Sequence, residues 1–427
     1  MSENSANGEE QNEVLSVEQE YELWKKNCHF MYDFVYESHI NWPSLSIQWL
    51  PDLQLSNDAV NANLILGTNT SGADTENVKL MSTNLPYYLM NNEDTGDATD
   101  KSNIKTATKI KIKKKFKHFN TEVNRTRYMP QNQNIIASIS GEGTAYVFYN
   151  DVNKKGNRSP ILSLKHHKDN GFGLDWSPFV EGQLLTAADD KEICLWDINY
   201  KAVQTKFDES EIKMDSIKPL HVVSSHKDIV NDVKWHKFDQ NLFGSVSDDK
   251  SLMIFDTRDL SKPAMVKENI HSDSVNSLAF STFSRNLLAT GSSDSSIGLF
   301  DLRNLNLRLH SMMGHSESIT SLEWSPHTDG FLASGSEDRR VIIWDISKIG
   351  EEQSQDDADD GAPELFMMHA GHTSMVTDLS WHPNEKMKWL LSSVSDNNVI
   401  QLWKPTKNLT DPVDGWDNND VELKDLE

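Results

Sequence analysis

The sequence has few cysteines and no long apolar run. Its 427 residues include two cysteines, Cys28 and Cys194, which stand far apart in unrelated contexts. Neither a disulfide framework nor a cysteine metal site is expected from such spacing, and both residues are interpreted as buried small side chains. No stretch approaches the roughly 20 apolar residues of a membrane helix, and residues 1–10 lack the layout of a secretory signal. We therefore expect a soluble, intracellular protein without membrane contact.

Positive charge is also scarce. The chain has 41 Lys and Arg against 65 Asp and Glu, a formal net charge of −24. Because phosphate binding needs clustered Lys and Arg, naked nucleic acid is not expected as a direct partner. A strongly acidic protein attracts basic partners, but the same charge could serve only to keep the protein soluble. Charge alone does not separate these two interpretations.

One pattern recurs along the chain. It consists of a His, an apolar alternation that ends in an aromatic residue, and two apolar runs that each end at an Asp. The clearest copies begin at His167, His226, His271, His315 and His372. The aromatic residues set a register of seven copies, at Trp49, Tyr128, Trp176, Trp235, Phe280, Trp324 and Trp381. From Trp235 the next two steps are 45 and 44 residues, the length of a WD-type propeller blade.

This repeat predicts an all-β fold, a seven-bladed WD40 β-propeller. Each copy offers short strands rich in β-branched and aromatic residues, separated by Asp, Ser and Gly turns. A single sheet of this kind cannot bury both faces, whereas packing blades around an axis buries them. The last blade shows no fourth strand after Trp403, and residues before Trp49 or in the C-terminal tail could supply it.

The repeated Ser, His and Asp residues could suggest a hydrolase. A catalytic triad occurs once, however, whereas a structural hydrogen-bond network occurs in every blade. We therefore expect no catalytic residues, and we expect each loop His to donate to the turn Asp of its own copy, in the pairs His226–Asp249, His271–Asp294 and His315–Asp338. The chain also shows no phosphate-binding Gly-rich loop and no metal-ligand cluster, so neither a cofactor nor a metal is expected.

An N-terminal segment, residues 15–40, lies outside the repeat and is predicted to be a helix packed on the side of the propeller. Ser16 and Gln19 form a plausible capping box. Apolar residues recur at roughly helical spacing, at Leu23, Trp24, Phe30, Met31, Phe34 and Val35. This stripe could serve only to dock the helix, but it is wide enough to leave part free for a partner helix.

An acidic insertion, residues 348–364, interrupts the sixth copy after Trp344. It contains Glu351, Glu352, Asp356, Asp357, Asp359 and Asp360, and an apolar run, residues 365–368, follows it. A charge run usually forms a solvated loop. An acidic run joined to an apolar strand could instead hold the basic side chains and the apolar stripe of one amphipathic helix.

Other departures from the repeat are less informative. Residues 109–118, KIKIKKKFKH, are interpreted as a blade edge protected by lysines, with a nuclear-import signal as the alternative. We assign no role to the polar insertions 68–79, 91–102 and 208–218. The predicted domains are a disordered acidic N-terminus (1–14), the helix (15–40), the propeller (41–405) and an acidic C-terminal tail (406–427).

Long motifs in the chain resemble a known family. These are EYELWKKN from Glu20, WPSLSIQWLPD from Trp42, EVNRTRYMPQN from Glu122 and SKIGEEQSQDDADDGAPEL from Ser347. The chain is similar over nearly its whole length to the retinoblastoma-binding, histone-binding WD proteins that serve as shared chromatin subunits. Among them it most resembles the fungal subunits of type B histone acetyltransferases. The resemblance implies a non-catalytic subunit of the cytoplasm and nucleus that presents newly made histone H4 to a catalytic acetyltransferase subunit.

The resemblance also implies a site for histone H4, free or within H3–H4. In this family the first H4 helix lies between the N-terminal helix and the acidic insertion. The residues carried over are Phe30, Met31 and Phe34 for the apolar face, Leu365, Phe366 and Met367 for closing the groove, and Asp356, Asp357, Asp359 and Asp360 for the basic side chains. The resemblance thereby identifies the expected ligand of the acidic and apolar groove that the residues themselves indicate.

A second site is implied on one face of the ring, where some relatives bind the histone H3 tail. Glu122, Asn124, Phe172 and Asp396 fit that pattern, but Asn170, Asn231 and Ser318 stand where those relatives carry acids, and Thr320 replaces an aromatic residue. Each lost charge-assisted contact weakens binding by roughly 1.5–3 kcal/mol if it is desolvated, and by less at an exposed rim. H4 binding is therefore the firmer expectation.

Three other functions compete with this expectation. The same histone site would suit a subunit of nucleosome-assembly, deacetylase or methyltransferase complexes. A generic WD scaffold or a ubiquitin-ligase substrate receptor would not depend on the acidic insertion. A propeller hydrolase would show turnover in the purified chain.

Overall fold

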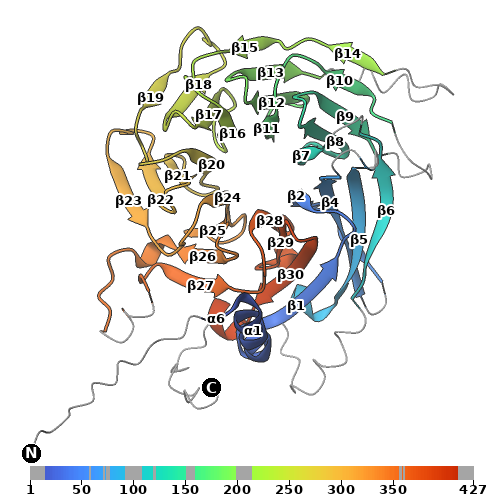
Figure 1. Ribbon diagram of the computed structural model, residues 1–427, viewed down its shortest axis with the longest axis vertical. Helices are drawn as coiled ribbons and strands as arrows, with labels where there is room; N and C mark the ends of the chain where they lie inside the picture. Colours follow the sequence, from blue (N-terminus) through green and yellow to red (C-terminus); the bar gives the residue numbers. More distant parts are fainter. Residues whose placement is uncertain are drawn as a thin grey trace, which may run out of the picture.

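The computed structural model is a ring of seven β-sheets around a central axis (Figure 1). It describes residues 15–56, 59–70, 73, 77–91, 108–118, 122–150, 159–198, 214–354, 358 and 361–411. Each sheet is one blade, and in every blade one edge strand lies at the axis (Figure 1). The predicted seven-bladed all-β propeller is therefore confirmed.

Blades 3 to 6 each have four antiparallel strands, which follow one another from the axis to the rim in chain order. Blade 3 has β11 (Gly171–Trp176), β12 (Gln183–Ala188), β13 (Ile193–Asp197) and β15 (His221–Val223). Blade 4 has β16 (Val230–Trp235), β17 (Leu242–Ser247), β18 (Leu252–Asp256) and β19 (Met265–Lys267). Blade 5 has β20 (Val275–Phe280), β21 (Leu287–Ser292), β22 (Ile297–Asp301) and β23 (Arg308–Met312). Blade 6 has β24 (Ile319–Trp324), β25 (Phe331–Ser336), β26 (Val341–Asp345) and β27 (Leu365–His369), with the short helix η1 (Ile346–Lys348) after β26.

Blades 1 and 2 each carry an extra strand. Blade 1 has β2 (Ser44–Trp49), β4 (Ala59–Thr68), β5 (Val78–Pro86) and β6 (Ile110–Phe116), with β3 (Gln54–Leu55) beside β4 and the short helix α2 (Tyr88–Asn91) after β5. Blade 2 has β7 (Val123–Met129), β8 (Asn132–Ser140), β9 (Ala145–Tyr149) and β10 (Leu162–Leu164). The strand β14 (Asp215–Ile217), from one of the polar insertions, pairs with β10 in parallel. The lysine-rich segment forms β6 at the sheet edge, as predicted.

The N-terminal segment closes the ring. Blade 7 has β28 (Val376–Trp381), β29 (Leu391–Ser395) and β30 (Val399–Pro405), with the short helix η2 (Glu385–Met387) before β29. Its outer strand is β1 (Tyr32–His39), which runs antiparallel to β30. The fourth strand therefore comes from the residues before Trp49. The predicted helix 15–40 was too long, because the helix α1 (Val17–Met31) ends where β1 begins.

The core lies between neighbouring blades. Six of the seven register aromatics end the innermost strand of a blade and are buried: Trp49, Trp176, Trp235, Phe280, Trp324 and Trp381. The seventh, Tyr128, lies one residue before the end of β7 and is only partly buried. The predicted His–Asp pairs are present, with Nδ1–carboxylate distances of 3.0 Å for His226–Asp249, 3.2 Å for His271–Asp294 and 2.7 Å for His315–Asp338. In blade 6 the indole of Trp344 donates to Ser334, which also contacts His315. The repeated polar residues are therefore internal ties of the blades.

The C-terminal region is ordered over its first residues. The short helix α6 (Lys407–Thr410) follows β30 and lies beside α1 (Figure 1). Asp33 holds this turn, since its carboxylate accepts from the backbone N–H of Lys407 at 2.9 Å. The backbone N–H of Thr406 donates to the carbonyl of Met31 at 2.9 Å. The predicted tail 406–427 is thus docked on the ring through residue 411, and the predicted N-terminus 1–14 lies outside the described residues.

Candidate functional site

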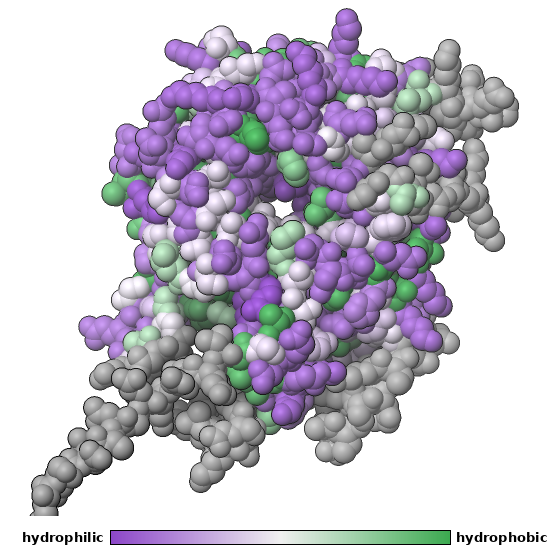
Figure 2. Space-filling view, in the orientation of Figure 1, coloured by the Kyte–Doolittle hydropathy of each residue, from purple (hydrophilic) through white to green (hydrophobic). Residues whose placement is uncertain are grey.

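Helix α1 begins at a capping box. The hydroxyl of Ser16 accepts from the backbone N–H of Gln19 at 3.3 Å, and the Gln19 side chain accepts from the N–H of Ser16 at 2.8 Å. This confirms the cap predicted from the sequence and satisfies two N–H groups that a helix start leaves free. The helix lies over the junction between blades 6 and 7, where apolar side chains gather on the surface (Figures 1 and 2).

A buried polar chain fastens α1 to that junction. The indole N–H of Trp24 donates to the hydroxyl of Tyr32 at 3.1 Å, and this hydroxyl lies 2.8 Å from Nδ1 of His369. Nε2 of His369 is 2.7 Å from Oε1 of Gln401, whose amide group donates to Glu37 at 2.8 Å. The chain therefore links α1, β1, β27 and β30.

Burial keeps two members of this hydrogen-bonded chain, His369 and Tyr32, in their neutral forms. Burial lowers the pKa of His369 well below its usual value, and the ring stacks on Trp403 with centroids 4.3 Å apart. Burial likewise raises the pKa of Tyr32. A neutral His can donate at one nitrogen and accept at the other, as the two contacts of His369 require. At the surface, Glu20 on α1 pairs with Arg340 at 2.8 Å and Arg339 at 3.1 Å.

An aromatic cluster lies beneath the end of the helix. Phe366 stacks on Trp389 at 5.5 Å, and Phe331 meets Trp389 edge-on at 4.8 Å. Met31 of α1 and Leu409 of α6 pack against the same apolar cluster. The backbone of Trp389 has a φ of 66°, a conformation that is strained for a bulky residue. These five residues form a partly exposed apolar surface bordered by α1, α6 and β27.

The structure unites some of the residues expected to bind H4. Met31 and Phe366 belong to this cluster, and Phe30 is 40% exposed on α1. Met367 packs in the same apolar core but is only 3% exposed. Phe34 is 7% exposed and packs between blades 7 and 1, so little of its side chain is open to a partner. Leu365 is partly buried against the cluster between blades 5 and 6, away from the other three.

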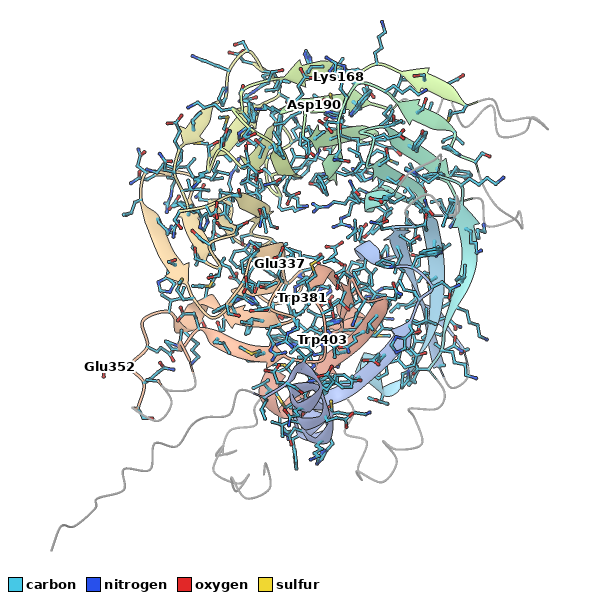
Figure 3. The ribbon with its side chains drawn as sticks, viewed as in Figure 1. Lys168, Asp190, Glu337, Glu352, Trp381 and Trp403 are labelled. Carbon is cyan, nitrogen blue, oxygen red and sulfur yellow. The ribbon has the colours of Figure 1, made fainter. Side chains whose placement is uncertain are left out.

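The acidic part of the predicted groove is described only at its start. Glu351 and Glu352 are exposed, and Glu352 projects from the rim of the ring on the loop that precedes β27 (Figure 3). Asp356, Asp357, Asp359 and Asp360 lie outside the described residues. Their contacts with histone side chains stay a prediction.

Sequence reasoning missed three members of this apolar cluster: Phe331, Trp389 and Leu409. Phe331 and Trp389 lie in blade segments, where an aromatic residue is normally interpreted as part of the hydrophobic core. Leu409 lies in the segment interpreted as an acidic C-terminal tail. The available signals were the surplus tryptophan after Trp381 in the last blade and the isolated apolar residue in a polar tail.

Three of the four candidates for an H3 tail lie close together in blades 2 and 3. The Asn124 amide donates to the carbonyl of Gly171 at 2.9 Å, which ties blade 2 to blade 3. Phe172 follows directly and is exposed, and Glu122 is partly buried. Asp396 lies in the turn between β29 and β30 of blade 7. This site stays a prediction.

A metal-binding cluster and a membrane-spanning helix are both absent from the described residues. Across that part of the chain, no group of three or more His, Cys, Asp or Glu is placed to hold a metal ion. Among the described helices, none has the length and apolarity to cross a bilayer.

Comparison with family models identifies two kinds of region. Residues 19–87 match the H4-binding model described as "Histone-binding protein RBBP4", a description that also takes in a component of the CAF1 complex. Residues 152–197, 217–256, 266–301, 307–345 and 364–404 match the WD domain, G-beta repeat. The first model spans α1, β1 and most of blade 1, which includes the helix side of the candidate groove.

Whole-chain relatives share one name, "Histone acetyltransferase type B subunit 2". The protein of that name from Debaryomyces hansenii is 47% identical, over 97% of this chain and 95% of its own length. The Schizosaccharomyces pombe protein is 47% identical, over 96% of this chain and 94% of its own. The Candida glabrata protein is 39% identical, over 96% and 94%.

Proposed function

This chain belongs to the family of RBBP4-type histone-binding WD-repeat proteins, and on that premise we propose that it is the histone-binding subunit of a type B histone acetyltransferase. In this role it binds newly made histone H4 and presents the H4 tail to a catalytic partner. The acetyl transfer itself belongs to that partner. The Ser, His and Asp groups of this chain are ties within the blades, which supports a non-catalytic role.

The observation that carries this proposal is the partly exposed apolar cluster at the blade 6–7 junction. Two of its residues, Phe366 and Trp389, belong to the propeller and face the C-terminal end of α1. An acidic segment immediately precedes β27 in the sequence. An amphipathic basic helix matches both features, because its apolar stripe covers the cluster and its Lys and Arg side chains meet the acids.

The test measures binding of a peptide spanning the first H4 helix to the purified full chain. We expect Asp357→Lys with Asp360→Lys to remove most of the binding. Glu351→Lys with Glu352→Lys makes the same change of net charge in the same insertion and is the matched control. Rising salt should weaken binding only in part, since apolar contacts are not screened. Unchanged affinity in the Asp357/Asp360 variant would sink the groove model.

The assembly is tested separately. A pull-down of the full chain from its source cell, followed by mass spectrometry, should recover a catalytic acetyltransferase subunit. Recovery of only nucleosome-assembly, deacetylase or methyltransferase subunits would support the shared-subunit alternative. We propose the cytoplasm and nucleus as its location, which fluorescence microscopy of a tagged chain checks.

A further inference from the structure

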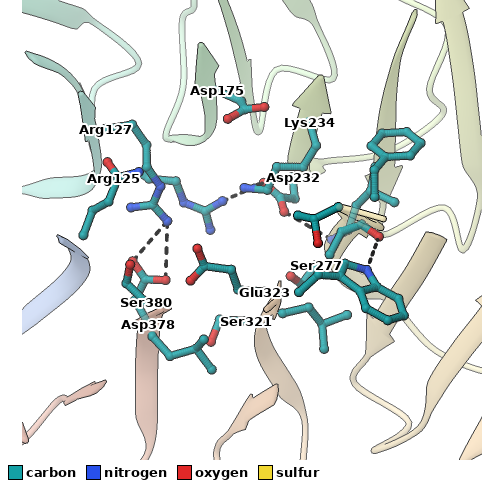
Figure 4. Close-up of a pocket in the computed structure, with 18 of the residues that line it drawn as sticks. Arg125, Arg127, Asp175, Asp232, Lys234, Ser277, Ser321, Glu323, Asp378 and Ser380 are labelled. Carbon is teal, nitrogen blue, oxygen red and sulfur yellow. Dashed lines mark hydrogen bonds and ion pairs between the residues drawn. The ribbon is translucent and has the colours of Figure 1, made fainter. Parts of the chain in front are cut away.

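A cavity lies on the axis of the ring, away from the α1 groove (Figure 4). Its volume is about 190 Å³, and the innermost strand of every blade contributes to its wall. The wall holds eight charged side chains: Arg125, Arg127, Lys234, Lys237, Asp175, Asp232, Glu323 and Asp378. Such a concentration of charge at the centre of a protein requires that each group be paired or hydrogen-bonded.

The three cations inside the cavity are all paired with only two of the carboxylates. Arg125 lies 2.6 Å from Asp232, Lys234 lies 3.2 Å from the same carboxylate, and Arg127 lies 3.2 Å from Asp378. The two arginine pairs cross between blades, from blade 2 to blades 4 and 7, whereas the Lys234–Asp232 pair lies within β16. They leave no unpaired cation deep in the cavity.

The other two carboxylates have no such partner. Asp175 accepts from the backbone N–H of Trp235 at 2.7 Å, and Glu323 accepts from that of Trp381 at 3.0 Å. Within the described residues, no Lys or Arg nitrogen lies within 4.0 Å of either carboxylate. Figure 4 shows the Glu323 carboxylate pointing into the middle of the cavity. The cavity therefore has negative charge available for an incoming cation.

The mouth of the cavity lies at the face where the innermost strands end. Lys237, Thr282 and Pro326 line it, and they come from the loops that follow β16, β20 and β24. The same face carries exposed phenylalanines at equivalent places in consecutive blades, each three residues after the last aromatic of the strand. They are Phe179, Phe238 and Phe283, with 46%, 39% and 44% of their surface exposed.

We propose that this face is a second docking surface, which binds a polypeptide segment by inserting one Arg or Lys side chain toward Glu323 and Asp175. Apolar residues on both sides of the inserted residue cover Phe238 and Phe283, and Phe179 extends this apolar arc. Lys237 at the rim repels a second cation, so the segment is apolar with a single basic residue rather than uniformly basic like a histone tail. The surface does not depend on the histone groove, and both can be occupied at once.

Charge complementarity distinguishes this occupant from a purely apolar one. An apolar plug would close the site over Asp175 and Glu323 while neither carboxylate has a Lys or Arg partner within 4.0 Å, which costs free energy. A basic side chain supplies the missing partner and can make charge-assisted hydrogen bonds. Aromatic rings around the entrance also favour a cation that passes over them.

The probe is a synthetic peptide array with one central residue between Leu, Ile or Phe flanks. The central residue is Arg, Lys, Gln or Glu, and binding to the purified full chain is measured by fluorescence anisotropy. We expect Arg and Lys peptides to bind at least about tenfold more tightly than the matched Gln and Glu peptides. Equal binding of the Gln peptides, or no binding by any peptide, would overturn the proposal.

Two variants locate the binding on this face. Phe238→Ser with Phe283→Ser should weaken the Arg peptide at least about tenfold. Leu309→Ser removes an exposed apolar side chain from β23, the outer strand of blade 5, and should change nothing. Glu323→Gln keeps the acceptor for the Trp381 N–H but removes the charge, and should reduce the preference for Arg over Gln. Thermal unfolding of each variant shows whether the ring stays folded, and an unchanged preference in a folded Glu323→Gln protein contradicts the model.

A pH titration adds a readout that lost packing would not produce. Burial raises the pKa of Glu323 to about 7, against the opposing influence of the Trp381 N–H and Arg127. Asp378 and Lys234 also face this carboxylate. A bound cation favours the ionised carboxylate, so Arg-peptide affinity should rise between pH 6 and pH 8. The rise should vanish in Glu323→Gln, and its persistence there would place the titrating group elsewhere.

Discussion

Replacing Trp24 by Ala should release α1 from an otherwise folded ring. Trp24 is the one buried residue of this helix, and it contacts Tyr32 and His369 as well as donating to the Tyr32 hydroxyl. Removal of a buried Trp side chain costs about 3–5 kcal/mol. Because these contacts dock the helix on the ring, the substitution should mainly weaken helix docking and should change the stability of the blades little.

The remaining ties of the helix are weaker than this loss. The pairs of Glu20 with Arg339 and Arg340 are partly exposed, and such pairs contribute about 0.2–1 kcal/mol each. The hydrogen bond from Tyr21 to Glu37 adds about 1 kcal/mol. A free helix of this length is marginal in water. We therefore expect the undocked segment to unfold locally.

The assay is hydrogen–deuterium exchange of the full chain, compared peptide by peptide. In Trp24→Ala, residues 17–31 should exchange much faster, whereas β24–β26 of blade 6 keep their protection. Binding of the H4 peptide should fall in parallel, because Phe30 and Met31 lose their fixed positions. Leu23→Ala changes an exposed neighbour on the same helix and should have little effect. Unchanged protection of residues 17–31 in Trp24→Ala would refute this account of how the helix is held.

Three further predictions concern the backbone, pH and ring closure. In Gly371→Ala the new methyl group would lie 2.6 Å from the Trp24 indole and 2.5 Å from the Gln401 side chain. Hydrogen exchange of residues 17–31 should therefore again accelerate. Exchange as slow as in the wild type would argue against this contact. Burial lowers the pKa of His271 to about 4 and of His372 and His382 to about 3. Below pH 6.5 these histidines take up protons in the unfolded chain but not in the folded protein. The urea concentration at the unfolding midpoint should therefore fall as the pH drops from 6.5 toward 4. A midpoint that does not change with pH would contradict the burial of neutral imidazole rings. A chain that begins at residue 40 lacks β1 and exposes the edge of β30, so its unfolding temperature should drop and light scattering should detect self-association; a stable monomer would show that β1 is dispensable.

The repeat made most of the fold predictable. Each copy carries its own register, because the aromatic residue at the end of the first strand and the loop His are fixed relative to each other. The capping box of α1 was also local, since both partners lie within one helical turn. Such features depend on neighbouring residues and can be read from a single sequence.

The misassigned segment shows where that reasoning stops. Met31, Phe34 and Val35 have the spacing of a helix, and nothing local ends the helix at Met31. The segment from Tyr32 becomes a strand because β30 offers it an unpaired edge in the finished ring. Tertiary pairing outweighs local propensity here, as it commonly does for strands.

The candidate site was predictable only in part for the same reason. The helix and the apolar run of β27 could be recognised in the sequence because they stand at interruptions of the repeat. Trp389 and Leu409 join them through folding, from a blade turn and from beyond the last strand. Leu365 was expected in the groove, but a bulge between β26 and β27 turns the strand so that Phe366 contacts Trp389 instead.

The pairing of β1 with β30 has a consequence for biosynthesis. A ribosome makes β1 among the first segments and β30 among the last, so blade 7 cannot be completed until almost the whole chain has emerged. The candidate histone groove combines α1 with residues of β27, Trp389 and α6, and it therefore does not exist on a nascent or truncated chain. If the proposed groove is the histone site, only a finished ring can bind histone, and an incomplete chain instead displays an unpaired strand edge that chaperones can recognise.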